Sequence, residues 1–166
     1  MRYTKDDGTL AKVFNKVMKK FKDDFEHLKD TKILYLWFEG ARARPGEQRV
    51  LGVTRLADKR MRDIFGYDII IEINADAWPE LSKRQRQKLA YHELCHIGVK
   101  QTKDGGVKHY IIKHDFELKR FRKEMEAFGL DESEEDFRMF LNLVRKKQKG
   151  GKKHGGSKHR KVRRDD

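Results

Sequence analysis

The sequence predicts an α+β fold with a small, mostly antiparallel sheet. Short β-branched apolar runs between polar residues indicate strands, and apolar residues at spacings of three and four indicate amphipathic helices. An Asp-Gly step between two alternating segments indicates a β-hairpin. The length of 166 residues suits one domain, which we place at residues 1–145, followed by a basic tail at residues 146–166.

An amphipathic N-terminal helix is expected over residues 9–30, with Thr9 as its N-cap. Apolar residues recur there at spacings of three and four, which is typical of a helix with one buried face. That face consists of Leu10, Val13, Phe14, Val17, Phe21, Phe25 and Leu28.

Three strands are expected after this helix. The continuous apolar run at residues 33–38 indicates a buried strand, and the β-branched run at residues 67–73 indicates another. Residues 50–54 predict a third strand, although Gly52 inside it is unfavourable for a strand. An exposed turn is expected at residues 42–48.

A second long helix is predicted over residues 82–97. Ser82 and Gln85 fit a capping box at its start, and no Gly or Pro interrupts the segment before Gly98, which should end it. The apolar stripe that would face the core consists of Ala90, Leu94 and Ile97.

This helix contains a His-Glu-x-x-His motif at residues 92–96. His92 and His96 project from the side roughly opposite the apolar stripe, with Cβ atoms about 6 Å apart, so both imidazoles can bind one Zn²⁺. Glu93 would then take a proton from a water that the metal activates. The pattern is typical of a zinc metallopeptidase. The alternative is a pair of ordinary surface histidines on a basic helix.

A β-hairpin is expected next, from residues 99–102 and 107–112, with an Asp-Gly step between them. A helix over residues 114–128 should follow and end at Gly129. A final helix should begin at Asp131, and its buried face would consist of Phe137, Phe140, Leu141 and Val144.

A catalytic zinc usually takes three protein ligands and one water. We favour His114 as the third ligand because it begins the helix after the hairpin, where the chain can return beside the two histidines. Glu117 is the main alternative, since a carboxylate also serves as a zinc ligand. His109 and Asp115 are further candidates. Asp115 could instead accept a hydrogen bond from the N–H of a ligand histidine, or serve as the N-cap of its helix.

Cys95 is the only cysteine, which excludes an intramolecular disulfide and a multi-cysteine zinc cluster. We interpret it as a small buried apolar group, and Tyr91 and Tyr110 as packing residues rather than donors to an oxyanion. The sequence shows neither the apolar stretch of a signal peptide nor the ~18 apolar residues of a membrane span. We therefore expect a monomeric cytoplasmic protein without membrane contact.

The C-terminal tail carries most of the charge. Residues 145–166 contain 11 Lys and Arg against two Asp, and so supply +9 of the net +13. Such a segment cannot bury enough apolar surface to order itself. It would contact DNA or RNA phosphates without sequence preference, or simply add solubility. The basic residues proposed for nucleic-acid contact are Lys152, Lys153, Lys158, Arg160, Lys161, Arg163 and Arg164.

Residues 68–78, 81–96 and 114–117, taken in this order, resemble the phage metallopeptidase family. More distantly they resemble the SprT-type zincins, which share the His-Glu-x-Cys-His form. The resemblance implies a zincin-like fold, a host-cell cytoplasmic location and protein or peptide substrates. It also implies one Zn²⁺ per chain, with His92, His96 and His114 as ligands and Glu93 as general base.

Two features depart from the SprT pattern. Asp115 stands where that pattern has Gly after its third histidine, and the single cysteine leaves no four-cysteine zinc ribbon. Zincins bind the substrate backbone by strand addition to an edge strand, for which the strands at residues 33–38 and 67–73 are the candidates. A different hypothesis is a nucleic-acid-associated protein with a structural zinc, which a buried fourth ligand would favour over an open coordination position.

Overall fold

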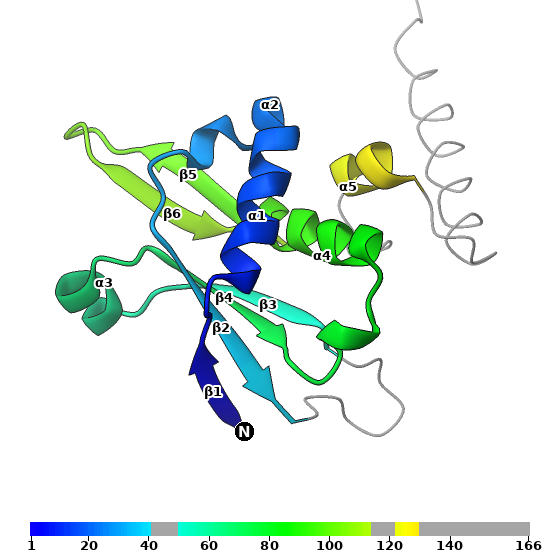
Figure 1. Ribbon diagram of the computed structural model, residues 1–166. Coiled ribbons are helices and arrows are strands. Elements are labelled where there is room, and N and C mark those ends of the chain that lie inside the picture. The colour runs from blue at the N-terminus through cyan, green and yellow to red at the C-terminus, as the bar shows by residue number, and fades with distance from the viewer. Residues whose placement is uncertain (41–49, 114–121, 130–166) are drawn as a thin grey trace, which may run out of the picture. The chain divides into compact units, whose positions relative to one another are not determined.

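A four-stranded sheet in the order β1-β2-β4-β3 supports the other elements (Figure 1). The central strands β2 and β4 run parallel, while β1 and β3 pair antiparallel to them at the two ends. The strands are β1 (Arg2–Lys5), β2 (Ile33–Glu39), β3 (Gly52–Leu56) and β4 (Ile69–Asn74). The predicted α+β class is confirmed, and the three expected strands form within two residues of their predicted positions.

The computed structural model describes residues 1–40, 50–113 and 122–129, which belong to one unit, Met1–Gly129. Its helices are α1 (Thr9–Lys20), α2 (Lys22–Phe25), α3 (Lys59–Phe65), α4 (Lys83–Cys95) and α5 (Arg122–Phe128), with short 3-10 turns η1 (Glu26–Leu28) and η2 (Trp78–Glu80). None of these described helices combines the length and the apolar character that a membrane crossing requires.

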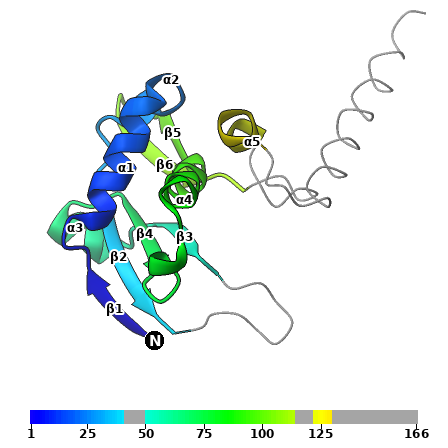
Figure 2. The same ribbon diagram turned by 45° about the vertical axis from the view of Figure 1, so that its right-hand side comes forward.

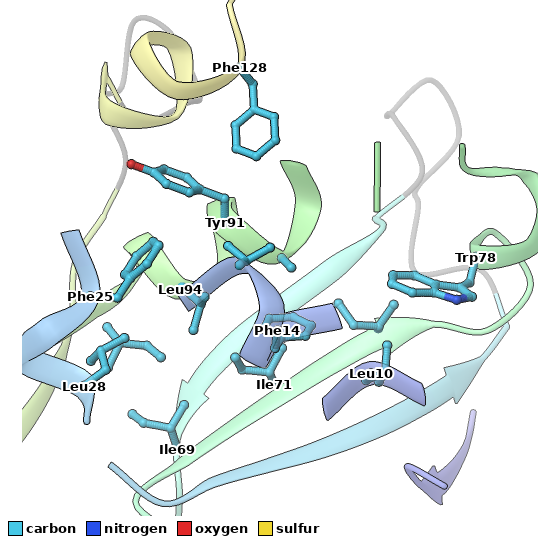
Figure 3. Packing of buried hydrophobic residues seen from close by; sticks show 14 residues of the cluster. Leu10, Phe14, Phe25, Leu28, Ile69, Ile71, Trp78, Tyr91, Leu94 and Phe128 are labelled. Atoms are coloured by element: carbon cyan, nitrogen blue, oxygen red, sulfur yellow. The ribbon is translucent and has the colours of Figure 1, made fainter. Parts of the chain in front are cut away.

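Helices α1 and α4 lie side by side on one face of the sheet, as Figure 1 and Figure 2 show from two directions. Ile69, Ile71 and Ile73 alternate along β4, so all three face these helices and are fully buried. Figure 3 shows the helical side of this core, to which α1 and α4 contribute Leu10, Phe14, Tyr91 and Leu94. The core therefore fixes one side of α4 and leaves its other side for the motif histidines.

The predicted β-hairpin is present as β5 (Ile97–Gln101) and β6 (Val107–Ile111). The prediction that Gly98 ends the preceding helix is wrong, because α4 ends at Cys95 and Gly98 lies buried within β5. Gly98 is opposite Tyr110, and a Cβ at Gly98 would overlap the Tyr110 ring. This position needs glycine for the close approach of an aromatic ring rather than for a helix end.

The first helix is shorter than predicted. It stops at Lys20, because Phe21 leaves the helical conformation with φ −115° and ψ 50°, and the chain continues in the short segments α2 and η1. The Phe21 ring packs edge-on against Tyr91, at 5.0 Å between centroids. Packing around Tyr91 therefore outweighs the helical periodicity. The N-cap is Gly8 rather than Thr9, and the Asp6 carboxylate accepts from the backbone N–H groups of Leu10 and Ala11.

The two strands proposed to bind substrate as an edge are both interior, so that prediction is wrong. β2 lies between β1 and β4, and β4 lies between β2 and β3. Among the described strands, β3 ends the sheet on the side of α4, where Thr54 contacts Glu93. Strand order depends on long-range pairing, which the local sequence pattern does not encode.

Helix α5 ends at Phe128, and Gly129 follows with a φ of 75°, as predicted for a helix end. The earlier part of the expected helix, at residues 114–121, lies outside the described residues. The final helix, the boundary at residue 145 and the basic tail also lie outside them.

Candidate metal centre on helix α4

The start of α4 forms as its sequence predicts. The Ser82 hydroxyl accepts from the Gln85 backbone N–H at 3.3 Å, and the Gln85 side chain accepts from the Ser82 backbone N–H at 2.8 Å. This reciprocal capping box fixes where the helix begins. It also sets which residues reach the core, since Ala90 and Leu94 are fully buried.

The two motif histidines meet on the side of α4 away from that core. Their Nε2 atoms are 3.3 Å apart, and the ring planes are inclined by 78°. His96 follows the last residue of α4 with a helical φ of −70°, so the four-residue spacing of the motif is kept. The structure thus brings His92 and His96 together as predicted from their spacing.

The second ring nitrogen of each histidine, Nδ1, lies within hydrogen-bond distance of an oxygen atom. His92 Nδ1 lies 2.6 Å from a carboxylate oxygen of Glu124, and His96 Nδ1 lies 2.7 Å from the Ile112 carbonyl oxygen. Since both oxygens accept, a neutral imidazole at either position would carry its hydrogen on Nδ1 and its lone pair on Nε2. In that tautomer the two lone pairs would face one another.

This arrangement fits a tetrahedral metal ion. Two Nε2 atoms at 3.3 Å can share a hydrogen bond when one of them carries a proton, or can both bind one cation when neither does. Tetrahedral zinc with bonds of about 2.0–2.1 Å holds two ligand nitrogens roughly 3.3–3.4 Å apart, which is the separation observed. Neutral imidazoles held at Nδ1 by oxygen acceptors are also the usual state of zinc-binding histidines.

The described residues place two histidines together but no complete set of metal ligands. Within residues 1–40, 50–113 and 122–129, no group of three His, Cys, Asp or Glu side chains is placed to hold a metal ion. The predicted ligand His114 and the alternatives Asp115 and Glu117 lie outside this part of the chain. The remaining candidate, His109, makes a 3.0 Å hydrogen bond to Thr31 and lies 3.8 Å from Asp68.

Glu93 lies between α4 and the edge strand β3. Its side chain is almost fully buried, and the Thr54 hydroxyl lies 2.6 Å from its Oε2. Burial raises the pKa of the Glu93 carboxyl above its usual value, and the Thr54 hydrogen bond opposes that rise. A carboxyl of this kind suits a group that must both accept and release a proton.

Gly52 allows this position of Glu93. Gly52 and Thr54 pair with Ile73 and Ile71 of β4, and so face the same helix-covered side of the sheet. A Cβ at Gly52 would lie 2.5 Å from Glu93 Oε1, which is closer than real Cβ contacts come. Glycine is unfavourable inside a strand, but at this position its missing side chain leaves space for the Glu93 carboxylate.

Of the other residues considered near the motif, Tyr91 packs in the core as predicted, whereas Cys95 is only partly buried and Tyr110, which lies over Gly98, is exposed. Tyr91 is in the core, and its hydroxyl donates to Asp24 at 2.9 Å. Burial raises the pKa of the Tyr91 phenol above its usual value, and burial raises the pKa of the Cys95 thiol to about 12. A thiol with that pKa remains protonated near neutral pH and is not a reactive nucleophile.

Three residues that contact the motif were not found from the sequence. Thr54, Gly52 and Glu124 are far from the motif along the chain, and only Gly52 carries a local signal, a glycine inside a strand. Glu124 is one of several charged residues near the start of α5, and nothing in its local sequence marks it as a buried carboxylate.

A family model described as "Putative phage metallopeptidase" matches residues 1–145. No curated protein and no solved structure matches the chain.

Proposed function

The chain belongs to the family described as "Putative phage metallopeptidase", and on that basis we propose that it is a zinc-dependent endopeptidase with a zincin-like fold. Its substrates would be proteins or peptides. His92 and His96 would hold one Zn²⁺ per chain together with a third ligand, for which His114 is favoured and Glu117 is the alternative.

The observation that carries this proposal is the convergence of two Nε2 atoms at 3.3 Å, with an oxygen acceptor on each Nδ1. An oxygen acceptor on the second ring nitrogen is what metal-binding histidines usually have. The buried Glu93 beside them supplies the proton acceptor that peptide hydrolysis requires.

A bound zinc ion would supply Lewis-acid activation of a water and of the scissile carbonyl. Glu93 would accept the proton of the attacking water and pass it to the leaving amine. Its burial keeps the carboxylate away from bulk solvent, and the Thr54 hydroxyl fixes one carboxylate oxygen at 2.6 Å.

The geometry of the sheet suggests how a substrate would bind. β3 ends the described sheet and lies beside Glu93, so a peptide that pairs with its outer edge would extend next to the two histidines. Backbone pairing of this kind is largely independent of side chains. We therefore expect broad cleavage of unfolded polypeptides rather than recognition of one sequence.

Removal of the metal tests the proposed function. A chelator should abolish cleavage of unfolded casein by the purified protein, and an equivalent of Zn²⁺ should restore it, because the chain's own residues do not activate water sufficiently. The measurement is the rate of appearance of new amino termini. Cleavage that persists fully after verified zinc removal would argue against a metallopeptidase.

Gly52→Ala should lower the rate of casein cleavage by about 10²-fold, because the added Cβ displaces the Glu93 carboxylate. The clash is with a side chain rather than with the backbone, so folding and zinc content should remain. Val53→Ala is the matched control, since its side chain points to the opposite face of β3. Equal rates for Gly52→Ala and the wild type would show that the position of this carboxylate does not matter.

We propose that the basic tail adds a second function, contact with nucleic acid. Residues 146–166 contain ten Lys and Arg against two Asp and so supply +8 of the +13 net charge, and such contact would hold the enzyme near DNA or RNA. A structural zinc in a nucleic-acid-binding protein is the alternative to peptidase activity.

Deleting residues 146–166 should leave folding and zinc content unchanged and weaken binding to a labelled DNA duplex. Fluorescence anisotropy at low and moderate salt provides the measurement, and the affinity of the full-length protein should fall steeply as salt rises. If the full-length and shortened proteins bind alike, the tail does not anchor nucleic acid.

A further inference from the structure

Glu124 is a buried carboxylate with a specific partner. The residue is only 3% exposed, and its Oε2 lies 2.6 Å from His92 Nδ1. Burying a carboxylate is costly unless a hydrogen bond or an opposite charge compensates it. The contact with His92 provides that compensation, so the position of Glu124 is linked to the candidate metal centre.

Glu124 is not needed to hold α5 against α4, because other contacts already do so. The Phe128 ring packs against Phe21 and Tyr91, with ring centroids 5.5 Å apart in each case. The Arg84 guanidinium donates to the Phe128 carbonyl oxygen at 2.6 Å. Near the start of α5, Lys123 lies 3.4 Å from Asp24. A buried carboxylate on a helix anchored at both ends points to a role other than anchoring.

We propose that Glu124 is a positioning residue that holds the His92 imidazole with Nε2 toward the metal position and thereby strengthens zinc binding. This inference rests on the proposed function of His92 as a metal ligand. A carboxylate at Nδ1 fixes the tautomer and the orientation of the ring, and it raises the basicity of the opposite nitrogen. Its negative charge also offsets the charge that the metal brings to the ring.

The two histidines are held by groups of different kinds. The acceptor for His96 is the Ile112 carbonyl, which is fixed by the backbone where the chain leaves β6, and the Ile112 N–H donates back to the His96 carbonyl at 2.7 Å. The acceptor for His92 is a side chain, and so it can be changed without altering the fold of the hairpin. Glu124 is not itself a ligand in this arrangement, because it contacts the ring edge away from the facing Nε2 atoms.

The test is a zinc affinity measurement, which needs no substrate. Metal-free wild type, Glu124→Ala and Glu124→Gln would compete with a chromogenic chelator for Zn²⁺ at a temperature well below the unfolding midpoint of each. Glu124→Ala should bind zinc about 10- to 100-fold more weakly than the wild type. Glu124→Gln should show a smaller loss, because its amide oxygen still accepts from Nδ1 but carries no charge. Glu126→Gln, an exposed acid on the same helix, should bind like the wild type.

The outcomes are distinguishable. If the wild type binds zinc and both Glu124 variants bind it equally well, the positioning role is wrong while the proposed function stands. A lowered unfolding midpoint with unchanged affinity would assign Glu124 a purely structural role and would also overturn the proposal. Loss of zinc as complete as in His92→Ala would make Glu124 a ligand instead. If Glu124→Ala does not fold, the zinc affinity of Glu124→Gln relative to the wild type decides whether Glu124 positions His92. If the wild type binds no zinc, both the proposed function and this inference fail.

Discussion

Replacing Glu93 with Gln is expected to reduce peptide hydrolysis by about 10²- to 10⁴-fold while the fold and the bound zinc remain. The amide has nearly the same shape as the carboxylate, and its oxygen can still accept the Thr54 hydrogen bond that holds Glu93. It cannot accept the proton of the attacking water. The measurement compares initial rates of casein cleavage, with zinc content and circular dichroism recorded for the same preparations.

Thr54→Ser is the matched control for this experiment, since it keeps the hydroxyl that contacts Glu93 and should retain most of the activity. An active wild type combined with an equally active Glu93→Gln variant would show that another group moves the proton. The mechanism proposed for Glu93 would then be wrong, even if zinc binding by the two histidines were established.

His92→Ala and His96→Ala are each expected to abolish zinc binding, from about one ion per chain in the wild type to none. Each substitution removes one of two converging nitrogens, and the remaining imidazole with the third ligand would bind zinc far more weakly. The measurement is the metal content of dialysed protein by atomic emission, related to protein concentration. Loss of activity should follow the loss of zinc.

His109→Ala serves as the control for these variants, because His109 contacts Thr31 and Asp68 rather than the other two histidines. It should keep its zinc. Stoichiometric zinc in both His92→Ala and His96→Ala would contradict the metallopeptidase proposal, and loss of zinc in His109→Ala would identify His109 as the third ligand.

The parts of the structure that could be predicted are those with a local physical signal. The capping box of Ser82 and Gln85 sets the start of α4, and the four-residue spacing then places His92 and His96 on one side of it. The β-branched run before Asn74 predicts β4, which is buried along its whole length. The Asp-Gly step similarly predicts the β5–β6 hairpin.

The parts that could not be predicted depend on contacts between distant residues. Phe21 interrupts the first helix because its ring packs against Tyr91, and no feature of the sequence near Phe21 indicates this. The parallel pairing of β2 with β4 places β3 at the end of the sheet, although β3 lies between them in the chain. Glu124 is 32 residues from His92 and resembles an ordinary surface glutamate until the fold brings them together.

The most direct test of the metal centre is an anomalous diffraction measurement at the zinc absorption edge on crystals of the full chain. We expect one peak per chain, about 2.0–2.1 Å from His92 Nε2 and His96 Nε2, with one further protein ligand and one water. That open position is what hydrolysis requires. The absence of a peak between the two histidines, or a zinc enclosed by four protein ligands without water, would contradict the proposal that this site is catalytic.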